Sequence, residues 1–171
     1  FAELNLTSCS LRHLPPPVCF TRVKHLDISN NRFEGTELPI VDHGDVALLE
    51  SFVCRDAGSV SITGFEHCAQ LESIDMSGTK ATDATLASVA RMIQKHKKAH
   101  NITVCGASAN AAPVIEAMAG ERCGVASIDV SGCQLSSVSV ETWQALGESG
   151  SLSHVKCLRL RATGLAADAL A

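Results

Sequence analysis

Seven pairs of apolar residues, each pair split by one intervening residue, recur along this 171-residue chain at intervals of 22–30 residues. The pairs are Leu4/Leu6, Leu26/Ile28, Phe52/Cys54, Ile74/Met76, Ile102/Val104, Ile128/Val130 and Leu158/Leu160. Alternation of this kind predicts a short β-strand with one buried face. One such unit is too small to bury that face alone, so the repetition predicts stacked units whose strands share a parallel sheet.

Residues on both sides of each pair extend the repeat. An apolar or small residue lies three positions before each pair, and a small or amide residue lies three positions after it. The resulting pattern is L-x-x-L-x-L-x-x-N/C/T-x-L, and its clearest copies are residues 23–33 and 125–135. This pattern resembles the leucine-rich repeat family, and the resemblance covers the whole chain.

The resemblance implies an α/β fold. We expect a curved solenoid of about seven repeats, with parallel strands on the concave face and helices or extended segments on the convex face. The strands are expected near residues 4–6, 26–28, 52–54, 74–76, 102–104, 128–130 and 158–160. Residues 1–171 then form a single domain, and we expect further repeats of a longer chain to cover its first and last repeats.

The segments that connect the strands differ along the chain. Residues 15–17 are three prolines, which exclude a helix interior from the first connection and favour an extended one. Later connections predict amphipathic helices that begin at polar residues able to cap a helix N-terminus. These caps are Thr82 or Asp83, Asn110 and Ser139, and the last helix is expected to end near Gly147. Helices in connections of the longer repeats, where successive pairs are 26–30 residues apart, resemble the ribonuclease-inhibitor-like subclass of the family.

The resemblance also implies a role for the ninth position of the pattern. In the family, an Asn, Cys or Thr at this position hydrogen-bonds neighbouring backbone and forms a ladder along the stack. Here the position holds Cys9, Asn31, Ala57, Thr79, Ala107, Cys133 and Thr163. We expect the five polar or thiol side chains to form the ladder, to which Ala57 and Ala107 cannot contribute.

Charge and cysteine content narrow the class of protein. The net charge of −4 argues against a general surface for nucleic acid or for an anionic membrane. No apolar run approaches the 18 residues of a membrane span. Of eight cysteines, Cys9, Cys54 and Cys133 fill repeat positions that need no disulfide, and the paired cysteine caps of extracellular leucine-rich proteins are absent. We therefore expect reduced thiols and a cytoplasmic protein.

Motifs for catalysis and metal binding are missing from the sequence. It contains no G-x-S-x-G, no phosphate-binding glycine loop, no C-x-x-C and no H-E-x-x-H. His96 and His100 are four residues apart, but they lie at the lysine-rich end of a predicted helix, where we expect solvated side chains. The sequence thus predicts no enzyme and no catalytic, cofactor-binding or metal-ligating residues.

The residues within and just after each apolar pair are expected on the open, inner face of the sheet. The candidate partner-binding residues among them are Asp27, Arg55, Asp75, Asp129, Arg159 and Arg161. The three aspartates allow two interpretations: an acidic stripe that recognises a basic partner, or carboxylates that only bond neighbouring backbone. Arg159 and Arg161 predict a local basic patch.

The leading functional hypothesis is a non-catalytic scaffold that binds a protein partner on its concave face, without nucleic-acid binding or membrane insertion. A second hypothesis is the recognition or regulatory domain of an enzyme system, such as a ubiquitin-ligase receptor or a GTPase activator. A third follows from residues 74–80 and the predicted helix after them, which resemble one repeat of the CARMIL-type regulators of actin capping protein.

Overall fold

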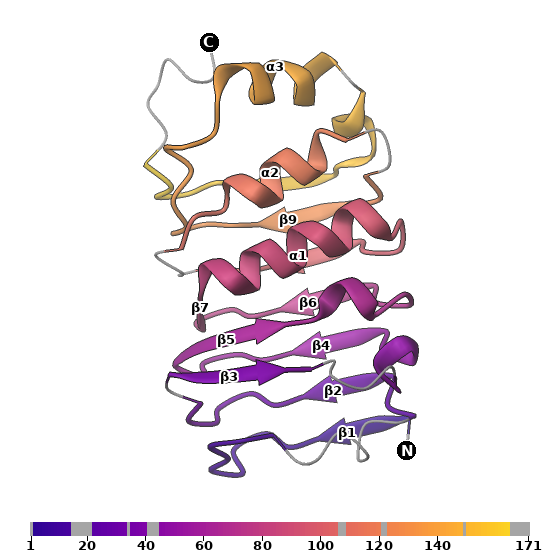
Figure 1. Cartoon of the computed structure of the whole chain (residues 1–171), viewed down its shortest axis with the longest axis vertical. Coiled ribbons are helices and arrows are strands. Elements are labelled where there is room, and N and C mark those ends of the chain that lie inside the picture. The colour runs from indigo at the N-terminus through magenta and orange to yellow at the C-terminus, as the bar shows by residue number, and fades with distance from the viewer. Residues whose placement is uncertain are drawn as a thin grey trace.

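A seven-stranded sheet runs along the stack of repeats, and each of its strands is three residues long (Figure 1). This computed structural model describes residues 2–14, 22–33, 35–40, 45–105, 109–120, 123–148 and 150–164. The strands, in their order across the sheet, are β1 (Glu3–Asn5), β2 (His25–Asp27), β4 (Ser51–Val53), β6 (Ser73–Asp75), β8 (Asn101–Thr103), β9 (Ser127–Asp129) and β10 (Cys157–Arg159). Each strand is shifted by one residue toward the N-terminus relative to its expected position. It begins one residue before the apolar pair, and the second apolar residue of the pair lies just beyond its end.

The register of the sheet aligns the apolar residues of successive repeats. Leu26 lies opposite Leu4 on one side and opposite Phe52 on the other, and Ile74 lies opposite Phe52 and Ile102 in the same way. Every pairing in this sheet is parallel. Because successive side chains of a strand point to opposite faces, this register gives the whole sheet one apolar face.

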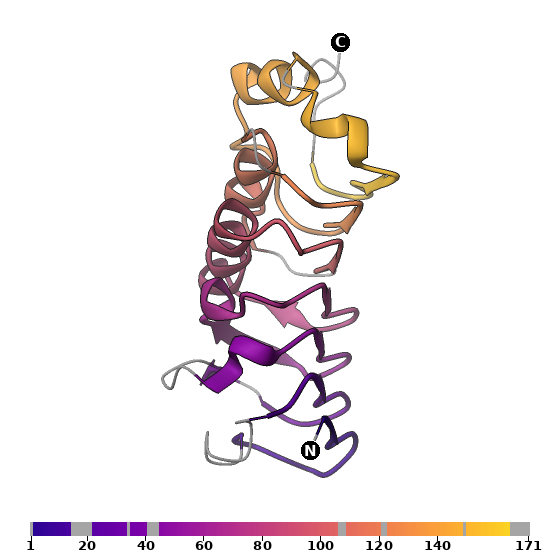
Figure 2. The ribbon, with the colours of Figure 1, turned by 90° about the vertical axis from the view of Figure 1, so that its right-hand side faces the viewer.

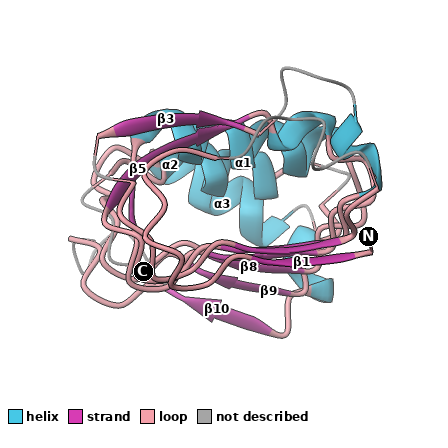
Figure 3. Cartoon of the chain, turned by 90° about the horizontal axis from the view of Figure 1, so that it is seen from below, coloured by secondary structure: helices cyan, strands magenta, loops and turns pink. Residues whose placement is uncertain are grey.

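The layer behind that apolar face changes along the chain (Figures 2 and 3). In the first half, three strands form a second parallel sheet: β3 (Thr36–Pro39), β5 (Ser59–Thr63) and β7 (Lys80–Ala81). Later connections hold helices instead: α1 (Asp83–Lys95), α2 (Ala112–Met118) and α3 (Val140–Glu148). Within the described ranges, the connections also hold three short 3-10 helices: η2 (Asp45–Leu48), η3 (Phe65–His67) and η4 (Ser151–His154). The structure is thus a mixed α/β stack, and its extended segments pair with each other in a way that the sequence did not predict.

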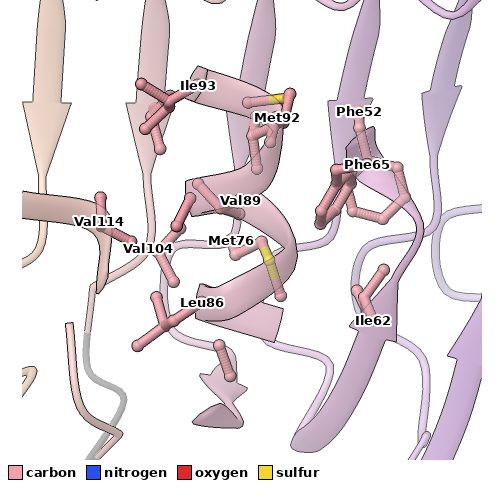
Figure 4. Close-up of a cluster of buried hydrophobic side chains, with 14 of the residues drawn as sticks. Phe52, Ile62, Phe65, Met76, Leu86, Val89, Met92, Ile93, Val104 and Val114 are labelled. Atoms are coloured by element: carbon pink, nitrogen blue, oxygen red, sulfur yellow. The ribbon is translucent and has the colours of Figure 1, made fainter. Parts of the chain in front are cut away.

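The core lies between these two layers. Phe52 and Phe65 meet edge to face, with ring centroids 5.4 Å apart. Helix α1 directs Val89 toward Met76 and Val104, and all three side chains are fully buried (Figure 4). Each repeat therefore contributes apolar side chains from its strand and from its connection to one continuous core.

Two of the three predicted helix caps are present as expected. Thr82 and Ser139 each accept a hydrogen bond from the backbone N–H three residues later, at the start of α1 and α3. The cap predicted at Asn110 is displaced by one residue: Ala111 holds the cap position of α2, and the Asn110 side chain accepts the N–H two residues on, at 2.9 Å. Helix α3 extends one residue past its expected end at Gly147. The prolines of residues 15–17 lie outside the described residues.

Two buried hydroxyls mark the place where the second sheet gives way to helices. Thr85 and Ser88 of α1 are fully buried. Thr85 Oγ1 accepts the N–H of Ile62 at 2.8 Å, and Ser88 Oγ accepts the N–H groups of Gly64 and Phe65 at 2.9 and 3.0 Å. Strand β7 pairs only with the first two residues of β5. The hydroxyls of α1 therefore accept the hydrogen bonds from the N–H groups that a longer β7 would otherwise accept.

The clearest member of the expected ladder is Asn31, which is 3% exposed. Its amide nitrogen donates to the carbonyl oxygens of Leu6 and Ile28, both at 2.8 Å, and its Oδ1 accepts the N–H of Leu11 at 2.9 Å. One side chain thereby joins the first two repeats. Ala107, the alanine expected to leave a gap later in the ladder, lies outside the described residues.

Other ladder positions follow the expectation in part. Thr79 and Cys133 each donate to a backbone carbonyl of the preceding repeat, at 2.6 and 3.1 Å. Thr79 Oγ1 also accepts the N–H of Ala57 at 3.0 Å. Although Ala57 has no polar side chain of its own, its backbone is therefore bonded by the ladder residue of the next repeat. Cys9 and Thr163 instead bond carbonyls within their own repeats.

Candidate functional site

One face of the seven-stranded sheet points away from the core, on the side opposite the helices and the second sheet (Figure 3). We call it the open face. Its two rows of strand side chains are Glu3, His25, Ser51, Ser73, Asn101, Ser127 and Cys157, and Asn5, Asp27, Val53, Asp75, Thr103, Asp129 and Arg159. All of them are exposed or half-buried, and most are polar or charged. Since the strands already bond one another, these side chains are the groups with which this face can contact a partner.

The six predicted partner-binding residues all lie along the open face. Asp27, Asp75 and Asp129 occupy the same row on alternate strands, β2, β6 and β9, and are therefore about 10 Å apart from one to the next. Arg159 continues this row on β10. Arg55 and Arg161 lie in the next row, two residues beyond their strands, and both are exposed.

Two of these six residues pair with each other. Arg55 Nε and Nη2 donate to Asp75 Oδ2 at 2.8 and 2.6 Å. The other carboxylate oxygen, Asp75 Oδ1, accepts the backbone N–H and the hydroxyl of Ser77 at 3.0 and 2.6 Å. Partial burial raises the pKa of the Asp75 carboxyl, but the hydrogen bonds from Arg55 and Ser77 outweigh it and hold the pKa below its ordinary value. Asp75 is therefore occupied from within the chain, and the acidic stripe is interrupted at its centre.

The other two aspartates bond neighbouring backbone, as the second interpretation expects, but each does so with only one carboxylate oxygen. Asp27 Oδ1 accepts the N–H of Ser29, and Asp129 Oδ1 accepts the N–H of Ser131, both at 2.9 Å. Each aspartate thus shapes the turn after its strand with one oxygen. In the described part of the chain, neither carboxylate forms an ion pair, so the second oxygen of each is not held by a Lys, Arg or His side chain.

Ser29 differs from its expected exposure on the open face. It is only 4% exposed, and its hydroxyl accepts the N–H of Arg55 at 3.0 Å. Ser131 makes the equivalent contact with the N–H of Arg161 at 3.2 Å. These serines therefore join successive repeats, and recognition is left to the longer side chains beside them.

A shallow hollow of about 160 Å³ opens on this face across β1, β2 and β4. The residues lining it are Glu3, Leu4, Asn5, His25, Leu26, Asp27, Ser51 and Val53. Glu3 and Asp27 bring two negative charges to it. The sequence did not single out Glu3, because its position in the first row becomes meaningful only once the register places it one strand away from Asp27.

The opposite end of the open face is basic. Arg159 and Arg161 are both exposed, and within the described ranges neither forms an ion pair. Asp129 is the register neighbour of Arg159 on the adjacent strand. The open face therefore runs from acidic at β1 and β2, through an internally neutralised centre, to basic at β10.

The described residues contain no group of three or more His, Cys, Asp or Glu side chains arranged to hold a metal ion. His96, at the C-terminal cap of α1, and His100, directly before β8, both bond backbone: His96 Nε2 donates to the Glu66 carbonyl at 2.8 Å, and His100 Nδ1 donates to the Gly124 carbonyl at 3.2 Å. None of the described helices has the length and apolar character that a membrane crossing requires.

Comparison with known proteins connects this geometry to one family. Residues 22–43, which contain β2 and β3, match the family model described as Leucine Rich Repeat. The match supports a leucine-rich repeat protein, and the repeat motif of that class is generally a protein–protein interaction module and typically non-catalytic. A search among curated proteins found no match to the chain.

Proposed function

We propose that this chain is a non-catalytic interaction domain that binds a protein partner on the open face, as the concave face of a curved solenoid. The observation that carries the proposal is the difference in side-chain exposure between the two faces of the sheet. The inner residues of β2, β4, β6, β8 and β9 are buried to 2% exposure or less, whereas every outer residue remains exposed or half-buried. An open sheet face rich in polar and charged groups is suited to recognition.

The experiment that tests this proposal is site-specific photo-crosslinking in cell extract. One variant carries a photoreactive benzoylphenylalanine at Asn101, which is exposed on β8 of the open face, and a matched variant carries it at Gln94, which is exposed on α1. We expect a discrete protein adduct at Asn101 and much less of that adduct at Gln94. Equal capture at both positions, or capture at Gln94 alone, contradicts the assignment of the open face.

We also propose the ribonuclease-inhibitor-like subclass and a single domain over residues 1–171. Helices α1, α2 and α3 behind the sheet support this assignment, while the second sheet of β3, β5 and β7 departs from it in the first half. The resemblance of residues 74–80 to a CARMIL-type repeat and a role within a larger enzyme system stay predictions.

We propose a cytoplasmic location with reduced thiols. Burial raises the pKa of the Cys54 and Cys68 thiols to about 12, so both are unreactive packing groups within the core. None of the seven described cysteines forms a disulfide in the structure. Intact mass after alkylation of the denatured, unreduced protein tests the proposal, with one adduct expected for each cysteine. Two or more disulfides in protein isolated from its native source would overturn it.

A further inference from the structure

The repeats of this chain offer an internal comparison at three aspartates. Asp27, Asp75 and Asp129 occupy the same repeat position, and each uses Oδ1 to accept the N–H of the serine two residues later. They differ in what the preceding repeat places beside them. Arg55 on the preceding repeat donates two hydrogen bonds to Asp75 Oδ2. The position equivalent to Arg55 is Thr7 before Asp27 and Cys105 before Asp129, and neither side chain carries a charge.

The Asp75 site therefore shows what this geometry binds. With Oδ1 held by the turn, Oδ2 points where a guanidinium can donate through Nε and Nη2 together. That pair of parallel donors is available to arginine and not to lysine. Asp27 presents the same carboxylate, oriented by the same turn, and among the described residues no cation lies within ion-pair distance of it. Arg55 on the next strand acts on Asp27 only through longer-range attraction.

The surroundings of Asp27 favour a cation more than those of Asp129. Asp27 lines the hollow together with Glu3, so two carboxylates face the same space. The nearby cations are already engaged: Arg55 is bound to Asp75, and Lys24 is bound to Glu50 at 2.7 Å. Asp129 instead lies opposite Arg159 in the register, and this positive charge opposes a second guanidinium.

We propose that the hollow at β1, β2 and β4 receives an arginine side chain from the protein partner, with Asp27 Oδ2 and Glu3 as the acceptors. This inference rests on the proposed function of the open face and names the chemistry recognised at one end of it. The partner's guanidinium takes at Asp27 the place that Arg55 takes at Asp75. The hollow of about 160 Å³ provides room beside the carboxylate for the alkyl stem of the arginine, against Val53.

The direct test uses a small probe, so that the partner need not be known. The protein labelled with nitrogen-15 is titrated with N-acetyl-arginine methylamide, and separately with the citrulline analogue, which has nearly the same shape and no charge. We expect saturable shifts of the backbone amides of residues 3–5, 25–27 and 51–53 with the arginine probe, and only weak shifts with the citrulline probe. Asp27→Asn should weaken arginine binding by about fivefold, as expected for a partly exposed charge pair.

Asp129→Asn is the matched control, because its side chain makes the same turn contact and lies two strands from the occupied Asp75. This variant should leave arginine binding at the hollow unchanged. Equal shifts with citrulline, shifts centred on β9, or an Asp27→Asn variant that binds the arginine probe as tightly as the parent chain would each overturn the inference.

The crosslinking experiment separates this inference from the proposed function. If the adduct at Asn101 forms equally well with Asp27→Asn, a partner binds the open face without using the hollow, and only the arginine assignment fails. If the arginine probe binds the hollow but no adduct forms at Asn101, the guanidinium site stands and the proposed function fails. Loss of the adduct in Asp27→Asn, with the adduct retained in Glu116→Gln, whose side chain is exposed on α2 away from the open face, supports both.

Discussion

At the scale of single residues, similar repeat positions carry different chemistry because their neighbours differ. Asp75 is an internal ion-pair partner, while Asp27 with the same turn contact remains available to solvent and ligands. The ion pair is partly exposed, with 55% of the Arg55 side chain and 25% of the Asp75 side chain accessible. Such a pair contributes about 0.2–1 kcal/mol, so it specifies geometry more than it stabilises the fold.

Replacing Arg55 by methionine should raise the pKa of Asp75, because the variant keeps the turn contact but loses the guanidinium donors. A carboxyl whose folded pKa is lowered contributes stability above its unfolded pKa of 3.8 and loses that contribution as pH falls through the folded pKa. Arg55→Met should therefore cost up to about 1 kcal/mol at neutral pH, and the difference should shrink as pH falls below 4. Carbon-13 titration of the Asp75 carboxyl, with urea denaturation at several pH values, measures both effects.

Lys24→Met is the control for this prediction. It removes a second exposed ion pair, with Glu50, and Lys24 directly precedes β2, which is two strands from Asp75 on β6. The pKa of Asp75 should be the same in this variant as in the parent chain. A shift of similar size in both variants would mean that Asp75 responds to the general charge of the face and not to the contact with Arg55.

Within the described residues, the third residue after a strand of the seven-stranded sheet has a left-handed backbone in six repeats. This position holds Ser8, Asn30, Asp56, Gly78, Gly132 and Ala162, all with φ between 49° and 82°. Asparagine, aspartate and glycine tolerate this conformation, whereas alanine has no side-chain hydrogen bond to offset the strain. Ala162→Gly should therefore raise the free energy of unfolding by about 0.5–1 kcal/mol, after allowance for the greater freedom of glycine in the unfolded chain.

Chemical denaturation measures this change in the free energy of unfolding. Gly150→Ala is the control, for which we expect a change of the opposite sign. Gly150 has φ of 67° and open space where a Cβ would be placed, so alanine there is opposed by backbone strain alone. We expect Gly150→Ala to destabilise by about 1 kcal/mol. An Ala162→Gly variant less stable than the parent would show that the turn is set by contacts of the alanine methyl group.

At the scale of elements, the buried hydroxyls of α1 decide how the second sheet ends. The Ser88 hydroxyl accepts the N–H groups of Gly64 and Phe65 and donates to the Glu66 carboxylate at 2.6 Å. One small side chain thus makes three hydrogen bonds to η3 and to the residue just before it. Ser88→Ala should cost about 2–4 kcal/mol, because it leaves buried donors without acceptors. Ser73→Ala is the control: Ser73 is half-buried on the open face, its hydroxyl bonds only that of Ser51, and its loss should cost about 0.5 kcal/mol or less.

Urea denaturation with far-ultraviolet circular dichroism measures both serine variants and also shows whether each is folded. Equal costs at Ser88 and Ser73 would contradict the structural role assigned to Ser88. The outcome bears on the fold itself, because α1 contacts β5 and η3 through this hydroxyl and its neighbour Thr85.

The elements also show how far sequence alone reaches. The strands were located to within one residue, because alternation and a recurring interval are local signals that survive in every repeat. The pairing of β3 with β5 was not foreseen, since it joins residues 36–39 to residues 59–63 and nothing local specifies the partner. The pairing of Arg55 with Asp75 was equally hidden, although one signal exists: an arginine two positions after a strand precedes a repeat whose strand ends in aspartate.

At the scale of the whole molecule, burial falls off toward the first and last strands of the sheet. Phe52, Ile74 and Ile102 are 0–2% exposed, whereas Leu4 of β1 and Leu158 of β10 are only half-buried. In a stack where each repeat contacts only its neighbours, stability is approximately the sum of the repeats and the interfaces between them. The first and last strands therefore lose protection through local opening, at lower free energy than the central strands.

Native-state hydrogen exchange should show this gradient directly. We expect the slowest exchange at the amides of β4, β6, β8 and α1, and exchange about 100-fold or more faster at β1 and β10, which corresponds to an opening free energy lower by about 3 kcal/mol. Ile102→Ala tests the nearest-neighbour character: it should lower protection most in β8, next in β6 and β9, and least in β1. Uniform protection across all seven strands, with a uniform loss in Ile102→Ala, would mean that the repeats unfold as one unit. In that case, a partner bound at β1 and β2 would stabilise the distant β10 as much as the strands that it contacts.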